Sequence, residues 1–356
     1  MNHNITIIGA GVSGLSTAFA LLRRGHAVTV LERGEVGRES SWAGGGILSP
    51  LLPWDYPEAV TALALRSMAG YADWITDVEA QSGLIADYWR CGMRVFDAEM
   101  PEAALAWCAK HGLAAQRLDA RTLWLPDVAQ VRNPRLVAAL RAAVEQLGGT
   151  IRAQCAATGV LTHGERVAAV QTATEAVTAE RVVLAAGAWS GLGLAGLAPP
   201  PNIRPIRGQM LLFRLAPGVL DTILYRRGLY VIPRRDGHIL VGSTLEDAWF
   251  DKSTDDATRQ RLHREAAELL PALVDAEPVQ HWAGLRPGAP ANIPVIDRHP
   301  DFSNVYVNTG HYRYGVTMAP AAADLLADLV EGKEPALDPA PYRWEAAFAR
   351  RWTEAL

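Results

Sequence analysis

The sequence predicts an α/β protein with two interleaved domains, one built on a parallel sheet and the other on a mainly antiparallel sheet. Two observations predict this architecture. A glycine-rich strand, helix and strand unit opens the chain, and after residue 206 single buried strands give way to strands paired through short turns. The length of 356 residues also exceeds what one simple core needs.

The opening unit spans the first 32 residues. The apolar run 5–8 leads into the GxGxxG pattern of residues 9–14, a helical pattern covers 12–24, and a second apolar run, 27–31, ends in Glu32. The three glycines permit a tight turn, close approach to a pyrophosphate and close packing of the helix on the strand, while an acid at this place accepts hydrogen bonds from a ribose. The unit predicts Rossmann-type dinucleotide binding through Gly9, Gly11, Val12, Ser13, Gly14 and Glu32.

The later elements follow from periodicity and from start and stop signals. Helices are predicted over 57–81, over 133–147 with Asn133-Pro134 at its start, and over 318–330. Strands are predicted at 150–156, 181–186, 207–215, 229–233 and 238–243. We therefore expect a nucleotide-binding domain over residues 1–80, 133–206 and 285–346, a second domain over 81–132 and 207–284, and a tail over 347–356, with the ligand between the two sheets.

Composition limits the classes of partner and compartment. A net charge of -4 and a pI near 6.2 argue against nucleic-acid and anionic-membrane binding. Cys91, Cys108 and Cys155 are scattered, which favours buried thiols in a reducing compartment. The uncharged stretch 182–203 contains four glycines and three prolines, so we expect a buried strand and a loop there instead of a membrane span. No basic segment precedes the first strand, and a cytoplasmic protein is expected.

Further motifs identify a family. They are ESSWAGGGI at 39–47, AAGAWS at 185–190, YVIP at 230–233, GLRPG at 284–288 and GHYRYG at 310–315. In this order and spacing they make the chain resemble the D-amino-acid oxidase superfamily of flavoproteins over nearly its whole length, and within it the glycine oxidases of thiazole (thiamine) biosynthesis. The resemblance implies FAD as the cofactor and a homotetramer as the assembly.

The cofactor contacts expected beyond the opening unit lie in these motifs. The small residues 44–46 suit a segment that runs along a pyrophosphate and ribityl chain, although a flexible lid would have the same composition. No cysteine or histidine lies between 33 and 53 or within 312–320, which favours a non-covalent flavin. The further expected contacts are Arg33, Ser40, Ser41, Gly45, Gly46, Ile47, Ala157, Gly187, His311, Tyr312, Tyr314, Gly315, Val316 and Thr317.

The C-terminal helix has a predicted electronic role. A helix that starts near Met318 presents its N-terminal N–H groups to the flavin's pyrimidine edge, where negative charge gathers on reduction. The alternative is an ordinary helix that only covers the sheet.

Three side chains are expected on the substrate side. Arg286 and Arg313 are 27 residues apart, the interval of the two substrate-side arginines in the glycine oxidase pattern, and Tyr230 is the matching hydroxyl donor. A guanidinium grips a carboxylate in two parallel hydrogen bonds, although a structural ion pair is the alternative for either arginine. Two positions depart from the pattern, since Tyr314 replaces Asn and Leu245 replaces Met.

The resulting functional hypothesis is an FAD-dependent amine oxidase acting on glycine or a small amino acid such as sarcosine or D-alanine. In this hypothesis, hydride passes from the substrate Cα to the flavin, and O2 then reoxidises the flavin and forms H2O2. Two alternatives stay open, a dehydrogenase of the same superfamily with another electron acceptor and a non-catalytic binding protein of the same fold. The chain has no Gly-x-Ser-x-Gly or Walker motif to support acyl or phosphoryl transfer.

Overall fold

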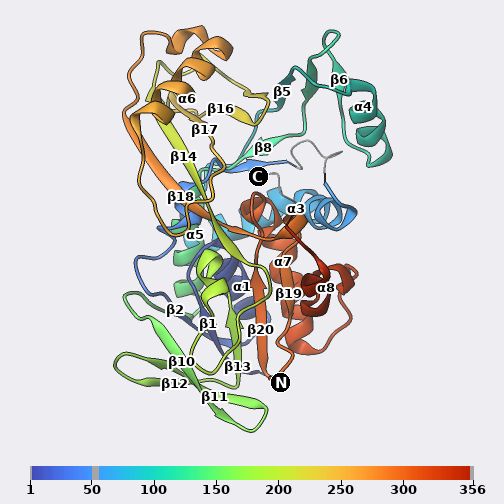
Figure 1. The fold of residues 1–356 in the computed structure, drawn as a ribbon. Helices are drawn as coiled ribbons and strands as arrows, with labels where there is room; N and C mark the ends of the chain where they lie inside the picture. Colours follow the sequence, from blue (N-terminus) through green and yellow to red (C-terminus); the bar gives the residue numbers. More distant parts are fainter. Residues whose placement is uncertain (1, 50–55, 353–356) are drawn as a thin grey trace.

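The computed structural model describes residues 2–49 and 56–352, so the last four residues of the predicted tail lie outside the described part. Figure 1 shows two layered regions, with the parallel sheet in the lower half and a large antiparallel sheet in the upper half. This arrangement confirms the predicted fold class.

The lower sheet has six strands in the order β19-β20-β13-β1-β2-β9. Every neighbouring pair is parallel except β19 and β20. Their bounds are β1 Asn4–Ile8, β2 Ala27–Leu31, β9 Thr150–Arg152, β13 Arg181–Leu184, β19 Val295–Arg298 and β20 Val305–Thr309. The strand predicted at 150–156 is thus only three residues long.

Successive side chains along these strands point to opposite faces of the sheet, and both faces are buried. Ile5 and Ile7 pack into a core formed with the helices α1 (Val12–Arg23), α3 (Glu58–Ser82), α5 (Asn133–Gln146) and α7 (Gly315–Glu331). Val182 and Leu184 point to the other side, into a core shared with β10 (Ala157–His163), β11 (Arg166–Thr172) and α8 (Trp344–Ala349). Burial on both faces is typical of parallel sheets and explains the continuous apolar runs in the sequence.

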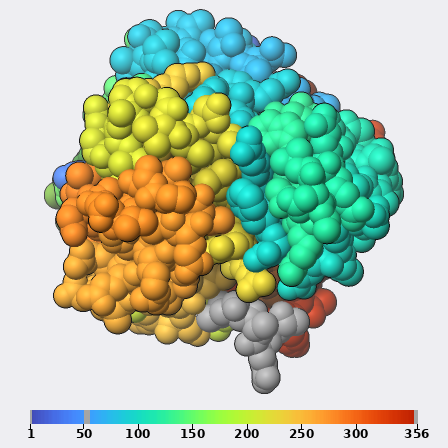
Figure 2. All heavy atoms as spheres, turned by 90° about the horizontal axis from the view of Figure 1, so that it is seen from above, coloured from blue at the N-terminus to red at the C-terminus, as the bar shows by residue number. Residues whose placement is uncertain are grey.

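The upper sheet has eight strands in the order β18-β14-β17-β16-β15-β5-β7-β6, of which only the β15 and β5 pair is parallel. Helix α6 (Asp256–Leu269) covers it. In the view from above, the region of α6 and the region of α4 (Pro101–Lys110) lie on opposite sides of this face (Figure 2). The strands are β5 Met93–Phe96, β6 Gln116–Arg117, β7 Leu123–Leu125, β14 Arg204–Arg214, β15 Ile223–Arg226, β16 Leu229–Pro233, β17 His238–Gly242 and β18 Gln280–Gly288.

Short elements complete the fold. One small sheet joins β3 (Ile47–Leu48), β8 (Ala129–Gln130) and β4 (Trp89–Arg90), and β12 (Ala176–Thr178) completes the β10-β11 sheet. The short helices are α2 Ser40–Ala43, η2 Gly187–Leu192, η3 Pro271–Leu273, η4 Pro290–Asn292 and η5 Ala340–Tyr342. The predicted domain boundaries at 206 and 285 fall inside β14 and β18, and the division into domains stays a prediction.

Helix α7 begins at Gly315, three residues before the predicted start near Met318. The reason lies in α3. Pro320 has no N–H to donate to the carbonyl of Val316, and the hydroxyl of Tyr71 donates to that oxygen instead, at 3.0 Å. The N–H of Ala321 in turn bonds to Oγ of Ser67, at 3.0 Å. The Tyr71 hydroxyl therefore takes the place of the hydrogen bond that Pro320 cannot donate, and Ser67 holds the next N–H, so that helical geometry continues from Pro320 back to Gly315.

None of the helices in the described ranges, 2–49 and 56–352, combines the length and the apolar character that crossing a membrane requires. The uncharged stretch 182–203 forms β13, the short helix η2 and a loop, as the prolines and glycines predict.

Candidate active site

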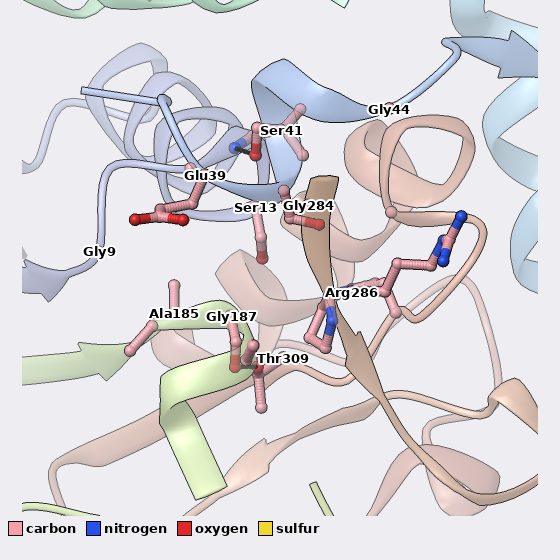
Figure 3. A pocket seen from close by; sticks show the side chains of 18 of the residues that line it. Gly9, Ser13, Glu39, Ser41, Gly44, Ala185, Gly187, Gly284, Arg286 and Thr309 are labelled. Atoms are coloured by element: carbon pink, nitrogen blue, oxygen red, sulfur yellow. Dashed lines mark hydrogen bonds between the residues drawn. The ribbon is translucent and has the colours of Figure 1, made fainter. Parts of the chain in front are cut away.

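A cavity of about 380 Å³ lies between the two large sheets. In Figure 3, Glu39 and Ser41 lie on one wall, Ala185, Gly187 and Thr309 lie on the facing wall, and Arg286 lies beside Gly284 at one end. Of the residues predicted from the sequence to form the site, all line this cavity except Gly14 and Thr317.

Those two residues lie behind the cavity wall. Gly14 lies under the turn, where a Cβ would come within 1.9 Å of the carbonyl oxygen of Gly9, so only glycine lets the helix pack there. Thr317 is fully buried and donates its hydroxyl to the carbonyl of Ile47, at 3.1 Å. Both residues therefore hold the backbone that lines the cavity and do not line it themselves.

The glycine-rich turn is shaped by contact with the neighbouring strand. Gly9 has a φ of +109°, and a Cβ there would lie 2.4 Å from the carbonyl oxygen of Ala185. A side chain at this position is excluded by both conformation and space. The turn thereby places the first N–H groups of α1 at the cavity, where a phosphate group is stabilised by the helix N-terminus.

Glu32 lies at the end of β2, as its position in the sequence predicts. The N–H of Ala10 donates to one carboxylate oxygen and the N–H of Gly34 to the other, both at 2.9 Å. Each carboxylate oxygen keeps a lone pair, because one hydrogen bond uses only half of its acceptor capacity. The two amides fix the carboxylate and leave it able to accept from a ribose.

The run 44–46 is held from behind by a buried arginine. A Cβ on Gly46, whose φ is +71°, would lie 2.1 Å from the carbonyl oxygen of Val131. Arg234 donates through Nη2 to the carbonyl of Gly45, at 2.9 Å, and through Nη1 to that of Val131, at 3.2 Å. Burial lowers the pKa of Arg234 to about 10, which still leaves the guanidinium charged. These contacts hold the run in place on the cavity wall, which favours a wall over a flexible lid.

Arg33 closes one side of the cavity. Its guanidinium stacks 3.6 Å from the ring centre of Trp189 and bonds to Glu39 at 3.2 Å. Lys252, from the loop that follows β17, bonds to the same carboxylate at 3.0 Å. These contacts connect the loop after β17 to Glu39 and Arg33 on the cavity wall.

The first turn of α7 forms another part of the wall. Gly315 and Val316 line the cavity, and the first N–H groups of any helix lack partners within the helix. His311 lies just before this turn, and burial lowers the pKa of its imidazole to about 4, so the ring is neutral near pH 7. Positive charge at this end therefore comes from the helix terminus and the nearby arginines.

Unpaired polar atoms on the wall test whether a flavin dinucleotide fits. Nε2 of His311, Oδ1 of Asn308 and the amide of Asn133 are buried without a hydrogen-bond partner in the part of the chain that the structure describes. An unpaired buried polar atom costs about 1–3 kcal/mol. Together with the glycine cradle and Glu32, these atoms fit an elongated ligand that carries both donors and acceptors, as FAD does.

The predicted substrate-side residues meet at the Arg286 end. The Nη2 of Arg286 lies 2.5 Å from Oγ of Ser243, and the hydroxyl of Tyr230 lies 2.7 Å from the same oxygen. Arg286 has no carboxylate partner among the described residues, so the alternative of a structural ion pair does not apply to it. The group is placed to bind an anionic ligand from the cavity wall.

Arg313 and Tyr314 lie next to this group. Arg313 lies close to Tyr56, Tyr225, Tyr230 and Tyr314. Tyr314 is buried and packs edge-on against Tyr56, with ring centres 4.9 Å apart. Leu245, the other departure from the family pattern, is not on the wall, and Met210 is.

Several wall residues were not predicted as contacts. Met210, Asn133, Asn308 and Thr309 reach the cavity, and Arg234 acts from behind it. Trp189 lies within a recognised motif, so the motif itself was the available signal. The others come from strands and helices whose local pattern shows only burial, and their place at the cavity depends on contacts distant in sequence.

A Rossmann-type unit, an ordered glycine wall, an anion-binding helix terminus and a cationic end define a flavoprotein oxidoreductase. The chain belongs to the FAD dependent oxidoreductase (DAO) family, whose model matches residues 4–329. The predicted superfamily and cofactor are confirmed by this match.

Named relatives are similar over nearly the whole chain. A glycine oxidase of Pseudomonas aeruginosa is 45% identical, covering 96% of this chain and 98% of its own length. A bifunctional protein ThiO/ThiG of Trichormus variabilis is 34% identical, covering 93% of this chain and 53% of its own length. The crystal structure of glycine oxidase from Geobacillus kaustophilus has a TM-score of 0.89 at 27% identity and covers 96% of this chain and 98% of its own.

Proposed function

We propose that this protein oxidises glycine or another small amino acid at its Cα–N bond, with FAD as the electron acceptor and O2 as the final oxidant. One observation carries the proposal. Arg286 and Tyr230 converge on Ser243 at one end of the cavity whose other walls fit FAD. A carboxylate held there leaves its amino carbon beside the wall formed by 44–46 and α7. Similarity to the two glycine oxidases supports the choice of substrate.

The proposed FAD contacts are the predicted residues on the cavity wall. They are Gly9, Gly11, Val12, Ser13, Glu32, Arg33, Ser40, Ser41, Gly45, Gly46, Ile47, Ala157, Gly187, His311, Tyr312, Tyr314, Gly315 and Val316. When bound, FAD supplies two-electron redox chemistry that no side chain provides. The chain supplies the rest: position, charge and exclusion of water.

Each substrate-side residue has a separate task. Arg286 binds the carboxylate as a planar two-pronged donor, which fixes its direction better than a point charge. Tyr230 adds a neutral donor from the neighbouring strand. Arg313 adds positive charge that favours an anionic substrate. The amine must lose its ammonium proton before hydride leaves Cα, and we assign no side chain as the base.

The neutral His311 and the terminus of α7 set the electrostatics beside Arg313 and Tyr314, next to the Arg286 end. The N-terminal N–H groups of α7 stabilise negative charge without a proton transfer, because they are fixed by the helix. A neutral imidazole beside them donates or accepts a hydrogen bond without adding a charge that would vary near pH 7. The charge on this part of the wall therefore stays the same near pH 7.

We propose a homotetramer in the cytoplasm, with an FAD-binding domain over 1–80, 133–206 and 285–346 and a substrate-binding domain over 81–132 and 207–284. The similarity to ThiO/ThiG proteins supports a place in thiamine biosynthesis.

The direct experiment uses the purified yellow protein with glycine, sarcosine and D-alanine in air. We expect H2O2 from at least one of them, with stoichiometric loss of O2. A flavin that glycine reduces without air but that only an added quinone reoxidises would indicate the dehydrogenase instead. No peroxide and no flavin reduction with any of the three would exclude both.

A further inference from the structure

Ser243 connects the two side chains that hold the substrate carboxylate in the function proposed above. Its Oγ lies 2.5 Å from Nη2 of Arg286 and 2.7 Å from the hydroxyl oxygen of Tyr230. A serine hydroxyl has one hydrogen to donate and two lone pairs to accept with. Since arginine only donates, Ser243 accepts from Arg286 and keeps its own hydrogen for another acceptor.

The phenolic oxygen of Tyr230 is within reach of that hydrogen, and either hydroxyl of the pair is able to donate. A hydroxyl that already accepts from a cation is a better donor, because hydrogen bonds in a chain polarise one another. If Ser243 donates to Tyr230, the hydrogen of Tyr230 is free to point at a ligand. In that arrangement Arg286 donates to Ser243, Ser243 donates to Tyr230, and Tyr230 donates to an anion in the cavity.

The remaining donors of Arg286 agree with this arrangement. Nη1 is directed at two main-chain carbonyl oxygens, those of Thr244 at 3.1 Å and of Arg207 at 3.3 Å. Nη2 gives one hydrogen to Ser243. Nε and the second hydrogen of Nη2 have no acceptor in the part of the chain that the structure describes, so the Nε and Nη2 side of the guanidinium is left to hold a carboxylate.

The loop that carries Ser243 is anchored on both sides. Before it, Gly242 pairs with Met210 in β14 and with Tyr230 in β16. After it, the hydroxyl of Thr244 accepts from the N–H of Gln209, at 2.8 Å, and donates to Glu246.

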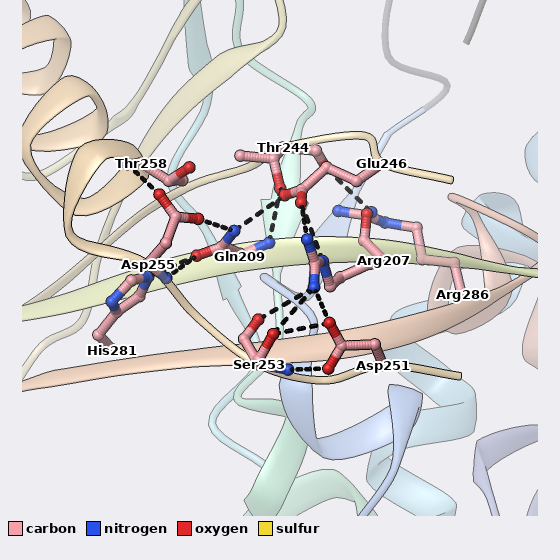
Figure 4. Close-up of polar contacts among 10 residues, drawn as sticks. All are labelled: Arg207, Gln209, Thr244, Glu246, Asp251, Ser253, Asp255, Thr258, His281 and Arg286. Carbon is pink, nitrogen blue, oxygen red and sulfur yellow. Dashed lines mark hydrogen bonds and ion pairs between the residues drawn. The ribbon is translucent and has the colours of Figure 1, made fainter. Parts of the chain in front are cut away.

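Glu246 in turn is held by Arg207. Their main chains exchange two hydrogen bonds, at 2.9 and 3.0 Å, and their side chains form an ion pair. Figure 4 shows Arg286 reaching the same short segment that Arg207 and Gln209 hold in place. The hydroxyl of Ser243 therefore starts from a fixed backbone, which a positioning group requires.

We propose that Ser243 is a positioning residue that orients Arg286 and, by donating to Tyr230, turns the Tyr230 hydroxyl toward the substrate carboxylate. The proposal rests on the function proposed above. It predicts that removal of this one hydroxyl weakens binding of carboxylates and leaves FAD binding unchanged.

The test compares Ser243→Ala and Ser243→Thr in the FAD-loaded enzyme. Acetate, a carboxylate without an amine, is titrated against the flavin absorbance, so the measurement needs no turnover. Thr222→Val is the matched control, because Thr222 is a buried hydroxyl in the same sheet region without a hydrogen-bond partner in the described ranges. FAD content and melting temperature are measured for every variant.

We expect Ser243→Ala to raise the Kd of acetate and the KM of glycine about tenfold with kcat nearly unchanged, and Ser243→Thr to restore most of the affinity. In a Tyr230→Phe background, the same serine substitution should have a clearly smaller effect, because the donor it orients is already gone. The proposal would be overturned if Ser243→Ala and wild type bound acetate with equal affinity. It would also be overturned if Ser243→Ala raised the Kd of acetate by the same factor in the Tyr230→Phe background as in the wild type. A wild-type enzyme that does not bind acetate would overturn it as well. A wild type that binds acetate but does not oxidise glycine contradicts only the proposed function.

Discussion

Arg234 donates a hydrogen bond to the carbonyl of Gly45 across the boundary between the two large sheets, at 2.9 Å. The guanidinium is buried, and it has no ion pair with a carboxylate among the described residues. Burying a cation without such a pair costs desolvation free energy. We infer that the guanidinium offsets this cost by holding the carbonyl groups at the cavity wall.

Replacing Arg234 with Met should therefore loosen the run 44–46. We expect the Kd of FAD to rise about tenfold, because the wall loses charge-assisted hydrogen bonds that order it. The measurement is flavin fluorescence during reconstitution of the apoprotein. Arg235→Met is the control, since Arg235 is the exposed neighbour and pairs with Asp87 away from this wall. Equal FAD affinity in Arg234→Met and the control would remove Arg234 from this role.

Tyr314 should limit the size of the substrate. It is buried on the wall and packs against Tyr56. Tyr314→Asn removes most of a ring, and we expect the ratio of kcat/KM for sarcosine to that for glycine to rise about tenfold, the usual effect of room for one methyl group. Steady-state oxygen uptake with both amines measures the ratio. An unchanged ratio in a fully FAD-loaded variant would show that Tyr314 does not bound the substrate space.

Tyr71 should stabilise the start of α7. Tyr71→Phe leaves the carbonyl of Val316 without a donor, which costs about 1–3 kcal/mol in the free energy of unfolding. Thermal and urea unfolding measure this cost. Tyr306→Phe is a suitable control because the structure shows no hydrogen bond from the Tyr306 hydroxyl within the described ranges. Equal stability of the two variants would mean that solvent or a shift of α7 satisfies the carbonyl.

Glu331 should make stability depend on acid pH. It joins the end of α7 to Arg24 at 2.9 Å, and also bonds to His26 and Lys333. Burial alone would raise its pKa, but the hydrogen bonds from Lys333 and Arg24 lower the pKa to about 2.

A lowered carboxyl pKa stabilises the fold above the unfolded pKa near 4.5, and this contribution is lost as pH falls toward about 2. We expect Glu331→Gln to cost about 1–2 kcal/mol at pH 7 and less than half of that near pH 3. Urea unfolding of both proteins at the two pH values gives the difference. A cost that stays constant with pH would show that packing, and not the charge, is responsible.

The parts of the fold that the sequence predicts are those with local causes. The turn at Gly9, the packing at Gly14 and the acid at Glu32 depend on backbone geometry within one strand, helix and strand unit, and each lies as predicted. Likewise, the continuous apolar runs predict strands, because a parallel strand that is buried on both faces of its sheet consists almost entirely of apolar residues.

What the sequence did not predict depends on distant contacts. The start of α7 is set by Tyr71 and Ser67, which lie about 250 residues away in the chain. Ser243 and Arg234 act only through partners on other segments of the chain. The motif at 230–233 ends directly before Arg234, but it does not show that the arginine reaches Gly45. Periodicity reports which residues are buried, but not which buried residue faces a cavity.

In the proposed function, Arg286 holds an amino acid by its carboxylate next to bound FAD. The measurement that tests it most directly is anaerobic titration of wild type and Arg286→Ala with glycine, followed by the visible absorbance of the flavin. We expect full reduction of the wild type and a half-saturating glycine concentration at least about thirtyfold higher in the variant, the equivalent of about 2 kcal/mol or more for loss of one partner in a charge pair. A wild type that glycine does not reduce, or a variant reduced at the same glycine concentration, would contradict it.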